Sequence, residues 1–338
     1  MAEGSRELPA HLRRALEYVA TADELRKETL VRTDVALGDF LGETVNDLQR
    51  KELRGTGPDV VASHGQTVGH WPFGGIGATL QIGDPDQLAK NCGLPVISHF
   101  RQGDVAVGGE GAPLTAGVNR LLFARPKKSI AILNLGGIAN VSLIPPARAR
   151  RSVVGSDCGP ANRLLDIAAR MRLDRPCDTS GKVAMRGEVD SDLLAVLKRH
   201  PWFKRTLPGS CGREEFNEAF LLESLKKAAV PHSADLLATL CAFSAWGVAR
   251  AVRLLDMNVD AVYASGGGVY NTRMMAELEE ALAPVPLFTV TRLGVHPEFL
   301  EALSFAMLGY FCVRGRALDL RAATGARRPA VLGRLTWP

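Results

Sequence analysis

Two short stretches near the middle of the chain set polar residues into apolar, strand-like sequence. Residues 130–144 read IAILNLGGIANVSLI, and residues 153–162 read VVGSDCGPAN. Apolar runs rich in β-branched residues predict two adjacent buried strands. Packing alone gives no reason for Asn134, Asn140 or Asp157 within such strands, so we expect these side chains to serve function.

Between the two asparagines, Gly136 and Gly137 suit a turn that receives a phosphate group. Without Cβ atoms a ligand can approach the main chain closely, and positive φ angles are open to both residues. Asp157, at the end of the second predicted strand, suits a general base that takes a proton from a hydroxyl group or water. The alternatives are structural: the glycines would form a β-bulge, and Asp157 would cap a helix that begins near Asn162.

Polar residues also follow or interrupt short predicted strands in the first third of the chain. A strand at 59–63 leads into a polar loop at 64–70, a kind of segment that commonly contacts ligands. In a second strand, at 79–84, Gln81 faces opposite to its apolar neighbours, and Asp84 is placed to cap the helix that follows.

A third strand, at 94–98, leads to a glycine-rich loop at 99–113 that contains Arg101. So many glycines indicate a loop that wraps closely over a ligand. Arginine offers a planar fork of donors for carboxylate or phosphate oxygens. We interpret Arg101 as a ligand contact, with a structural salt bridge as the alternative.

Helices and one more glycine motif are predicted in the rest of the chain. Helical periodicity covers residues 6–54, 181–199 and 233–255. A strand that begins at residue 260 ends in three consecutive glycines before a further helix. Such a turn suits close approach of a flat base or a phosphate to the main chain, and its glycines are Gly266, Gly267 and Gly268.

Composition limits the classes of protein to consider. The 338 residues, 46% of them apolar, suffice for two domains with separate cores. No apolar run approaches the roughly 18 residues of a membrane span, and a signal-peptide pattern is lacking, so we expect a cytoplasmic protein without membrane contact. The six cysteines form no Cys-x-x-Cys pair, which predicts reduced thiols and no metal site. The net charge of +5 is spread out, which favours an anionic small substrate over nucleic acid.

The chain carries a series of short motifs in a definite order, from about residue 37 to residue 333. They are His64–Thr67, Thr79–Asp84, Phe100–Arg101 with Asp104, Gly108–Pro113, Asn134–Asn140, Asp157–Asn162, Ser210–Glu214, Gly266–Gly268 and Glu301–Ala302. This series closely resembles that of the anhydro-N-acetylmuramic acid kinase family. An ordered set of this kind is far more specific than any one glycine pattern.

The resemblance implies an α/β fold of the actin, hexokinase and Hsp70 type, with two ribonuclease H-like domains around a cleft for ATP and Mg²⁺. We expect a first domain at residues 1–127, on the substrate side, and a second domain at residues 128–338, on the nucleotide side. A C-terminal helix at about 299–315 is expected to pack back toward the cleft. Related kinases pair as homodimers, so a homodimer is expected here.

The resemblance also implies the reaction and its residues. The 1,6-anhydro ring of the cell-wall sugar is opened by water while phosphate from ATP goes to O6, which gives N-acetylmuramate 6-phosphate. Asp157 matches the general base, and Arg101 and Glu301 match substrate contacts. Further substrate contacts are expected at His64, Gln66 and Gln81. The loop from Asn134 through Gly136 and Gly137 to Asn140 matches a phosphate-binding segment, and Gly266, Gly267 and Gly268 match the adenosine segment.

This sequence departs from the family pattern in several places. Family members open with a strand and a Gly-Thr-Ser-x-Asp-Gly turn, which does not occur in residues 1–36. We therefore expect a first domain truncated at its N-terminus and without one phosphate clamp. The usual aspartate before Phe100 is His99, the second glycine of the Asp157 motif is Ala161, and the usual Lys-Ser-Thr is the sequence at 209–211.

Two hypotheses follow from these departures. In the first, the protein is an active sugar kinase that phosphorylates 1,6-anhydro-N-acetylmuramic acid. In the second, it is a degenerate homologue that binds sugar or a protein partner without phosphoryl transfer.

Overall fold

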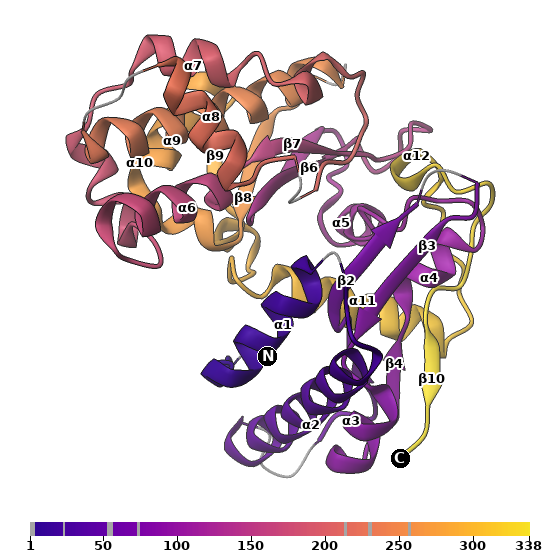
Figure 1. Ribbon diagram of the computed structural model, residues 1–338. Coiled ribbons are helices and arrows are strands. Elements are labelled where there is room, and N and C mark those ends of the chain that lie inside the picture. The colour runs from indigo at the N-terminus through magenta and orange to yellow at the C-terminus, as the bar shows by residue number, and fades with distance from the viewer. Residues whose placement is uncertain are drawn as a thin grey trace. The chain divides into compact units, whose positions relative to one another are not determined.

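The chain divides into two compact units in the computed structural model (Figure 1). Unit 1 comprises residues 1–118 and 301–338, and unit 2 comprises residues 119–300. This division differs from the sequence-based one at residues 127 and 128 chiefly because the C-terminal segment groups with unit 1. The structure describes residues 4–22, 24–52, 57–72, 75–212, 215–228, 232–255 and 258–338.

Unit 2 is built on a five-stranded sheet in the order β7-β6-β5-β8-β9. Strand β6 runs antiparallel to β5 and β7, whereas β8 and β9 run parallel to β5. This order, with only the second strand reversed, is that of a ribonuclease H-like sheet, and the α/β class is confirmed. The strands are β5 (Ile130–Leu135), β6 (Ile138–Ile144), β7 (Val154–Pro160), β8 (Ala261–Ser265) and β9 (Leu287–Thr289).

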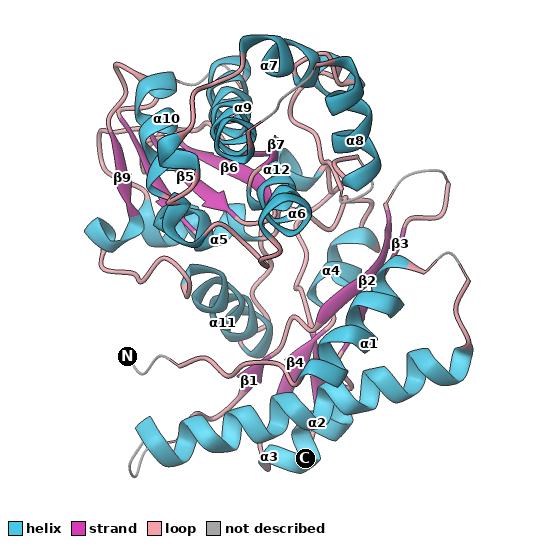
Figure 2. Ribbon diagram, turned by 60° about the vertical axis from the view of Figure 1, so that its left-hand side comes forward, coloured by secondary structure: helices cyan, strands magenta, loops and turns pink. Residues whose placement is uncertain are grey.

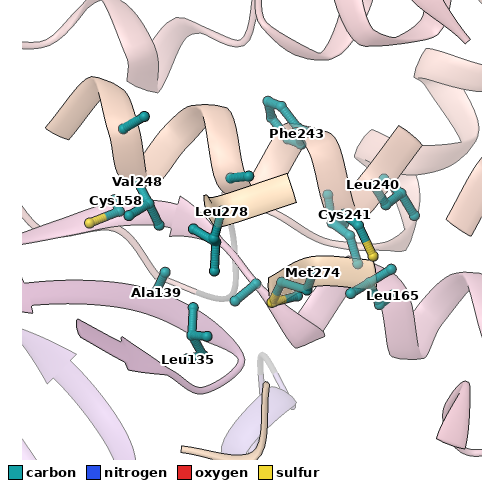
Figure 3. Packing of buried hydrophobic residues seen from close by; sticks show 14 of the residues in the cluster. Leu135, Ala139, Cys158, Leu165, Leu240, Cys241, Phe243, Val248, Met274 and Leu278 are labelled. Carbon is teal, nitrogen blue, oxygen red and sulfur yellow. The ribbon is translucent and has the colours of Figure 1, made fainter. Parts of the chain in front are cut away.

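Helices cover this sheet, and the largest hydrophobic core lies beneath them. Leu135 and Ala139 of the sheet belong to the same buried cluster as Leu240 and Phe243 of α9 (Figure 3). Helix α9 is long and apolar enough to span a membrane, but most of it is buried inside unit 2, as expected of a core helix. The helices over this core are α6 (Asn162–Leu173), α7 (Ser191–Leu197), α8 (Glu218–Lys227), α9 (Ser233–Leu254) and α10 (Thr272–Leu282). Helix α5 (Thr115–Phe123) contains the boundary between the two units.

Unit 1 contains two small sheets. One has the strand order β1-β4-β10, and the other is the antiparallel pair β2-β3 (Figure 2). Strand β10, from the end of the chain, pairs with β4 and so joins the C-terminal segment to this unit. The elements are α1 (Ala10–Thr21), α2 (Lys27–Glu52), β1 (Val61–Ala62), β2 (Gln66–Trp71), β3 (Ala78–Ile82), α3 (Pro85–Cys92), β4 (Val96–Ser98), α4 (Phe100–Val105), α11 (Leu300–Val313), α12 (Arg321–Thr324) and β10 (Arg334–Thr336).

Several local predictions can be compared with these elements. Asp84 caps α3 as predicted, because its side chain accepts hydrogen bonds from two main-chain N–H groups of the first turn. The prediction of a loop at 64–70 was wrong, since most of it forms β2, which pairs with β3. The prediction of one helix over 181–199 was also wrong. Short 3-10 turns precede α7 there, because Asp190 caps that helix at Ser191.

Candidate active site

A row of polar side chains crosses the sheet of unit 2. Asp157 of β7 pairs with Asn140 of β6, and Asn140 pairs with Asn134 of β5. Asn134 pairs in turn with Ser265 of β8. Residues paired directly across strands project from the same face of a sheet. The adjacent Leu135 projects into the helix-covered core, so the polar row lies on the opposite face.

A β-bulge aligns Asp157 with this row. The register shifts between Ala139 and Asn140, which pair with Gly159 and Asp157 and leave Cys158 as the extra residue. The bulge therefore lies in β7, and Gly136 and Gly137, where the sequence allowed one, form the connection between β5 and β6.

Asp157 is half-buried and is held by the segment at 209–211. Its main-chain N–H donates to the carbonyl of Gly209 at 2.9 Å, and its Oδ2 accepts from the N–H of Cys211 at 2.8 Å. Helix α6 begins at Asn162 with Ala161 as its N-cap residue and no side-chain cap. Asp157 therefore does not cap α6, and a carboxylate held in one orientation suits a proton acceptor.

Two thiols lie near this carboxylate. Burial, and after it the negative charge of Asp157, raises the pKa of the Cys158 and Cys211 thiols. Both thiols are therefore neutral at physiological pH. They neither add negative charge beside Asp157 nor act as nucleophiles.

The turn between β5 and β6 packs on the first residues of α6. The carbonyl of Gly136 accepts from the N–H of Asn162 at 3.0 Å, and that of Gly137 accepts from Ala161 at 2.9 Å and Arg163 at 3.1 Å. Because the C=O and N–H of a trans peptide point in opposite directions, the N–H of Gly137 is directed away from α6. Gly137 is exposed, so this donor suits an incoming phosphate oxygen.

The three glycines after β8 differ in what surrounds them. A Cβ on Gly266, whose φ is +81°, would lie 2.6 Å from Oδ1 of Asn134. A Cβ on Gly268 would lie 2.6 Å from Cβ of Leu135. A Cβ on Gly267 would meet no atom within 4 Å. Packing against the end of β5 therefore explains Gly266 and Gly268, whereas Gly267 faces open space that a nucleotide fits.

In unit 1, Arg101 and His64 form a hydrogen-bonded pair. Nε of Arg101 donates to Nε2 of His64 at 2.7 Å, and Nδ1–H of His64 donates to the carbonyl of Gly65 at 2.9 Å. A second arginine nitrogen donates to the carbonyl of Gly111 at 2.6 Å. Burial, followed by the charge of Arg101, lowers the pKa of His64 to about 4. His64 is therefore neutral and is held in one tautomer.

A buried aspartate supports the loop that carries Gly111. Oδ2 of Asp104 accepts from the N–H of Gly111 at 2.8 Å, and Oδ1 accepts from the hydroxyl of Thr324 at 2.9 Å. Burial raises the pKa of Asp104, and the bonds to Gly111 and Thr324 and the charge of Arg101 oppose the rise. A Cβ on Gly109 would lie only 2.1 Å from Oδ2 of Asp104, so glycine is required there.

Helix α11 adds Glu301 to the surroundings of His64. Phe305 packs against His64, with ring centroids 4.6 Å apart and ring planes tilted by 42°. Glu301 lies one helical turn before Phe305 and so on the same face of α11. Its carboxylate is exposed, in the first turn of the helix.

The two predicted glutamines lie on β2 and β3. Nε2 of Gln66 donates to the carbonyl of Thr67 at 3.1 Å. Nε2 of Gln81 donates to the hydroxyls of Thr79 at 2.8 Å and Thr67 at 3.2 Å, and Thr79 is also bonded to His70. The bonds of Gln81 with Thr67 and Thr79 and of Thr79 with His70 form a polar network on one face of the β2-β3 pair, whereas Gln66, which pairs with Ile82, projects from the other face.

His99 and Ala161, where the sequence departs from the family pattern, occupy element starts. His99 precedes α4 with a left-handed φ of 61°, an uncommon conformation outside glycine, and its Nδ1 lies 2.7 Å from Oγ of Ser98. Ala161 is fully buried at the start of α6. Arg213 and Glu214 lie outside the described residues.

A kinase of this kind would bind ATP together with Mg²⁺ on unit 2. The described part of the chain contains no group of three or more His, Cys, Asp or Glu residues that could hold a metal ion. Magnesium in phosphoryl-transfer sites is bound by few protein groups together with substrate phosphates. The open space at Gly267, the exposed Gly137 and the amide oxygens of Asn134 and Asn140 on the polar face are compatible with a nucleotide that brings its ion with it.

Comparison with known proteins identifies the family. A family model described as anhydro-N-acetylmuramic acid kinase matches residues 2–338. The chain belongs to this family. The resemblance drawn from the ordered motifs is thereby confirmed, and with it the assignment to the ATP-using sugar kinases.

Two relatives in this family illustrate the match. The anhydro-N-acetylmuramic acid kinase of Shewanella amazonensis is 37% identical over 331 residues, which span 96% of this chain and 88% of that protein. The protein of the same name from Coxiella burnetii is 35% identical over 331 residues, 98% of this chain and 88% of that protein. Among solved structures, a ROK hexokinase from Thermus thermophilus is similar, with a TM-score of 0.39, 16% identity and coverage of 82% of this chain and 86% of that one.

The structure brings the predicted residues together in two groups. Within unit 2 it aligns Asp157, Asn140 and Asn134 and places Gly266–Gly268 against the end of β5. Within unit 1 it joins Arg101 to His64. Sequence reasoning gave no role to the residues that hold these groups, although Gly111 and Cys211 lie in two of the ordered motifs and Ser156 lies beside Asp157. The missed residues are Ser156, Cys211, Gly111, Thr324 and Phe305.

Proposed function

We propose that this protein transfers the terminal phosphoryl group of ATP to O6 of 1,6-anhydro-N-acetylmuramic acid while water opens the anhydro ring. The product is N-acetylmuramate 6-phosphate, an intermediate of cell-wall sugar recycling. Membership of the family supports this activity. The observation that carries it is the Asp157 carboxylate, held by Cys211 in register with Asn140 and Asn134.

Asp157 is the proposed general base. Its carboxylate takes a proton from a water molecule, whose oxygen bonds to C1 of the sugar as the C1–O6 bond breaks. The released O6 bonds to the terminal phosphorus of ATP, and ADP leaves. Phosphoryl transfer asks mainly for positioning and neutralisation of charge, so one oriented base suffices.

The nucleotide is proposed to lie along the polar face of unit 2. The N–H of Gly137, beside Gly136, donates to phosphate oxygens, and the adenosine part lies against Gly266–Gly268, where Gly267 leaves room. The amide oxygens of Asn134 and Asn140 are of the type that Mg²⁺ accepts. When bound with the nucleotide, the ion neutralises phosphate charge.

The sugar is proposed to contact unit 1. Arg101 is held by His64 and by the carbonyl of Gly111, so its guanidinium is oriented before substrate binds. Glu301 offers an exposed carboxylate to sugar hydroxyls. Gln66 and Gln81 contribute polar groups from the β2-β3 pair. Preorganisation of this kind reduces the entropy lost on binding.

Two substitutions test the proposal. Asp157→Asn keeps the shape of the side chain but removes the base, and we expect kcat to fall at least about 100-fold with little change in the affinity for a non-hydrolysable ATP analogue. Arg101→Lys removes the planar fork of donors that binds both His64 and the carbonyl of Gly111. We expect the KM for the sugar to rise about 10-fold with the KM for ATP unchanged.

The measurement is formation of the sugar phosphate from the anhydro sugar and labelled ATP. Wild-type kcat retained by Asp157→Asn would refute the assignment of the base. Sugar binding by the wild-type protein without any product at high enzyme concentration would favour the degenerate homologue.

We also propose that the protein acts in the cytoplasm and forms a homodimer. The substrate and ATP are small molecules, and the reaction needs neither nucleic acid nor a membrane. Light scattering on the purified protein tests the dimer, and fractionation of the host cell tests the location.

A further inference from the structure

The segment at 209–211 is joined to β7 at the proposed base. Besides the two bonds of Asp157, the N–H of Gly209 donates to Oγ of Ser156 at 3.1 Å. The Ser156 hydroxyl in turn lies 3.1 Å from the carbonyl of Gly209 and 2.9 Å from that of Asp157, to one of which it donates. Ser156 thus binds the same residue, Gly209, that receives the main-chain N–H of Asp157.

Packing alone does not explain the buried hydroxyl group of Ser156. The side chain is 1% exposed, next to the buried Cys158 in the same strand. An alanine would fill most of this volume without burying a polar group. A buried hydroxyl that both donates and accepts specifies the geometry of its partner, which here is the segment that leads to Cys211.

These contacts lead to the carboxylate of Asp157. The N–H of Cys211 donates to Oδ2 of Asp157, and a donor on a carboxylate favours the ionised form. Among the described residues, the neutral thiols of Cys158 and Cys211 lie near Asp157, and the carboxylate of Glu215 acts on Cys211. The main-chain donor is therefore a favourable contact for an ionised Asp157 within this set.

We propose that Ser156 is a positioning residue for the phosphoryl-transfer reaction. Its hydroxyl holds Gly209, so that the N–H of Cys211 stays in place to orient the carboxylate of Asp157 and to favour its ionised form. The inference rests on the proposed function in taking Asp157 as the base, and it adds a residue that acts through the main chain of a neighbouring segment.

Ser156→Ala tests this inference in the full-length protein, with Ser156→Thr as the variant that keeps the hydroxyl. Ser142→Ala is the matched control, because Ser142 is an equally buried serine in the neighbouring strand that does not contact Gly209. The first readout is the titration of Asp157 in protein labelled with ¹³C at the aspartate carboxyl carbon. Its signal is assigned by its loss in Asp157→Asn.

We expect the titration midpoint of Asp157 to move upward by about half a pH unit or more in Ser156→Ala. It should stay in place in Ser142→Ala and return toward wild type in Ser156→Thr. Amide hydrogen exchange of a peptide covering residues 207–212 should become faster only in Ser156→Ala. We expect kcat to fall about 10-fold with unchanged KM values, and the acid limb of its pH profile to move upward with the carboxyl titration.

Cys211→Pro and Cys211→Ala provide a second route if Ser156→Ala fails to fold. Proline removes the N–H that Asp157 accepts, whereas alanine removes only the thiol, so only Cys211→Pro should move the titration midpoint. An unmoved midpoint in Ser156→Ala or Cys211→Pro overturns the positioning role, whether or not the protein is active. A moved midpoint in a protein that makes no sugar phosphate would instead refute the proposed function and leave the hold on Asp157 intact.

Discussion

His64 shows how one residue links the fold of unit 1 to its proposed chemistry. Its Nδ1–H donates to the carbonyl of Gly65, so Nε2 is the acceptor of the hydrogen bond from Nε–H of Arg101. Protonation of Nε2 would remove this acceptor and place two positive charges in contact. The low pKa of His64 comes first from its burial and then from the charge of Arg101, and the hydrogen bond between the two side chains orients Arg101.

The stability of the protein should depend on pH through His64. Its folded-state pKa of about 4 lies below the ordinary value of 6.5, so its contribution is complete above pH 6.5 and is lost as pH falls toward 4. The loss amounts to at most about 3 kcal/mol. Urea denaturation at pH 7 and pH 4.5 should show a smaller loss of stability for His64→Gln than for wild type.

The exposed His11 provides the control for this measurement, because its replacement by Gln should leave the pH dependence unchanged. Equal losses for His64→Gln and wild type would show that the His64–Arg101 pair is not formed in solution.

For single residues, the sequence indicated candidate functional residues better than it indicated their hydrogen-bond partners. Arg101 was predicted as a ligand contact or a salt bridge, and the structure shows that it binds a neutral histidine and a carbonyl. Neither partner is implied by charge, and Gly111 becomes one only because the loop folds back over α4. Whether Arg101 contacts the sugar stays a prediction.

At the scale of elements, the glycine-rich connections separate packing from function. The sequence predicted close approach at Gly266–Gly268, and the structure explains Gly266 and Gly268 by contact with β5. The apolar runs predicted two adjacent buried strands, but the first run forms both β5 and β6, so β6 lies between β5 and β7. The bulge at Cys158 was not predicted, because register depends on the partner strand β6 and leaves no signal in one strand alone.

Gly109→Ala should destabilise unit 1. The new Cβ would overlap Oδ2 of Asp104 and displace the loop that carries Gly111. We expect a loss of roughly 1–3 kcal/mol in the free energy of unfolding. Gly267→Ala, with open space around its Cβ, is the matched control and should unfold at the wild-type urea concentration. Equal midpoints for the two variants would contradict the contact with Asp104.

Gly267→Ala has a second use in nucleotide binding. A methyl group in the space proposed for adenosine should weaken binding of a non-hydrolysable ATP analogue several-fold, measured by calorimetry, without loss of stability. Unchanged affinity would contradict the proposed placement of the adenosine at this turn.

At the scale of the whole molecule, each unit has its own core and its own group of candidate functional residues. The polar row lies in unit 2, and the Arg101–His64 pair lies in unit 1. The division could not be placed from sequence, because the pairing of β10 with β4 is a contact between distant segments. Composition indicates only that the chain has enough apolar residues for two cores.

Separate cores predict separate thermal transitions. Thr324→Val removes a hydroxyl from the buried carboxylate of Asp104 and should destabilise unit 1 by about 1–3 kcal/mol. An ATP analogue should stabilise unit 2. Calorimetry should then show one transition that falls with Thr324→Val and another that rises with the analogue. A single transition that responds to both would show that the units unfold together.

The return of residues 301–338 to unit 1 has a consequence for synthesis on the ribosome. Residues 119–300 form one continuous segment, so unit 2 has all of its chain outside the exit tunnel before the last residues leave it. Unit 1 must wait for Thr324 and β10, the partners of Asp104 and β4, to leave the tunnel. In full-length chains still attached to the ribosome, residues 1–118 should therefore be digested by protease while residues 119–300 resist, the reverse of the usual N-terminal-first order.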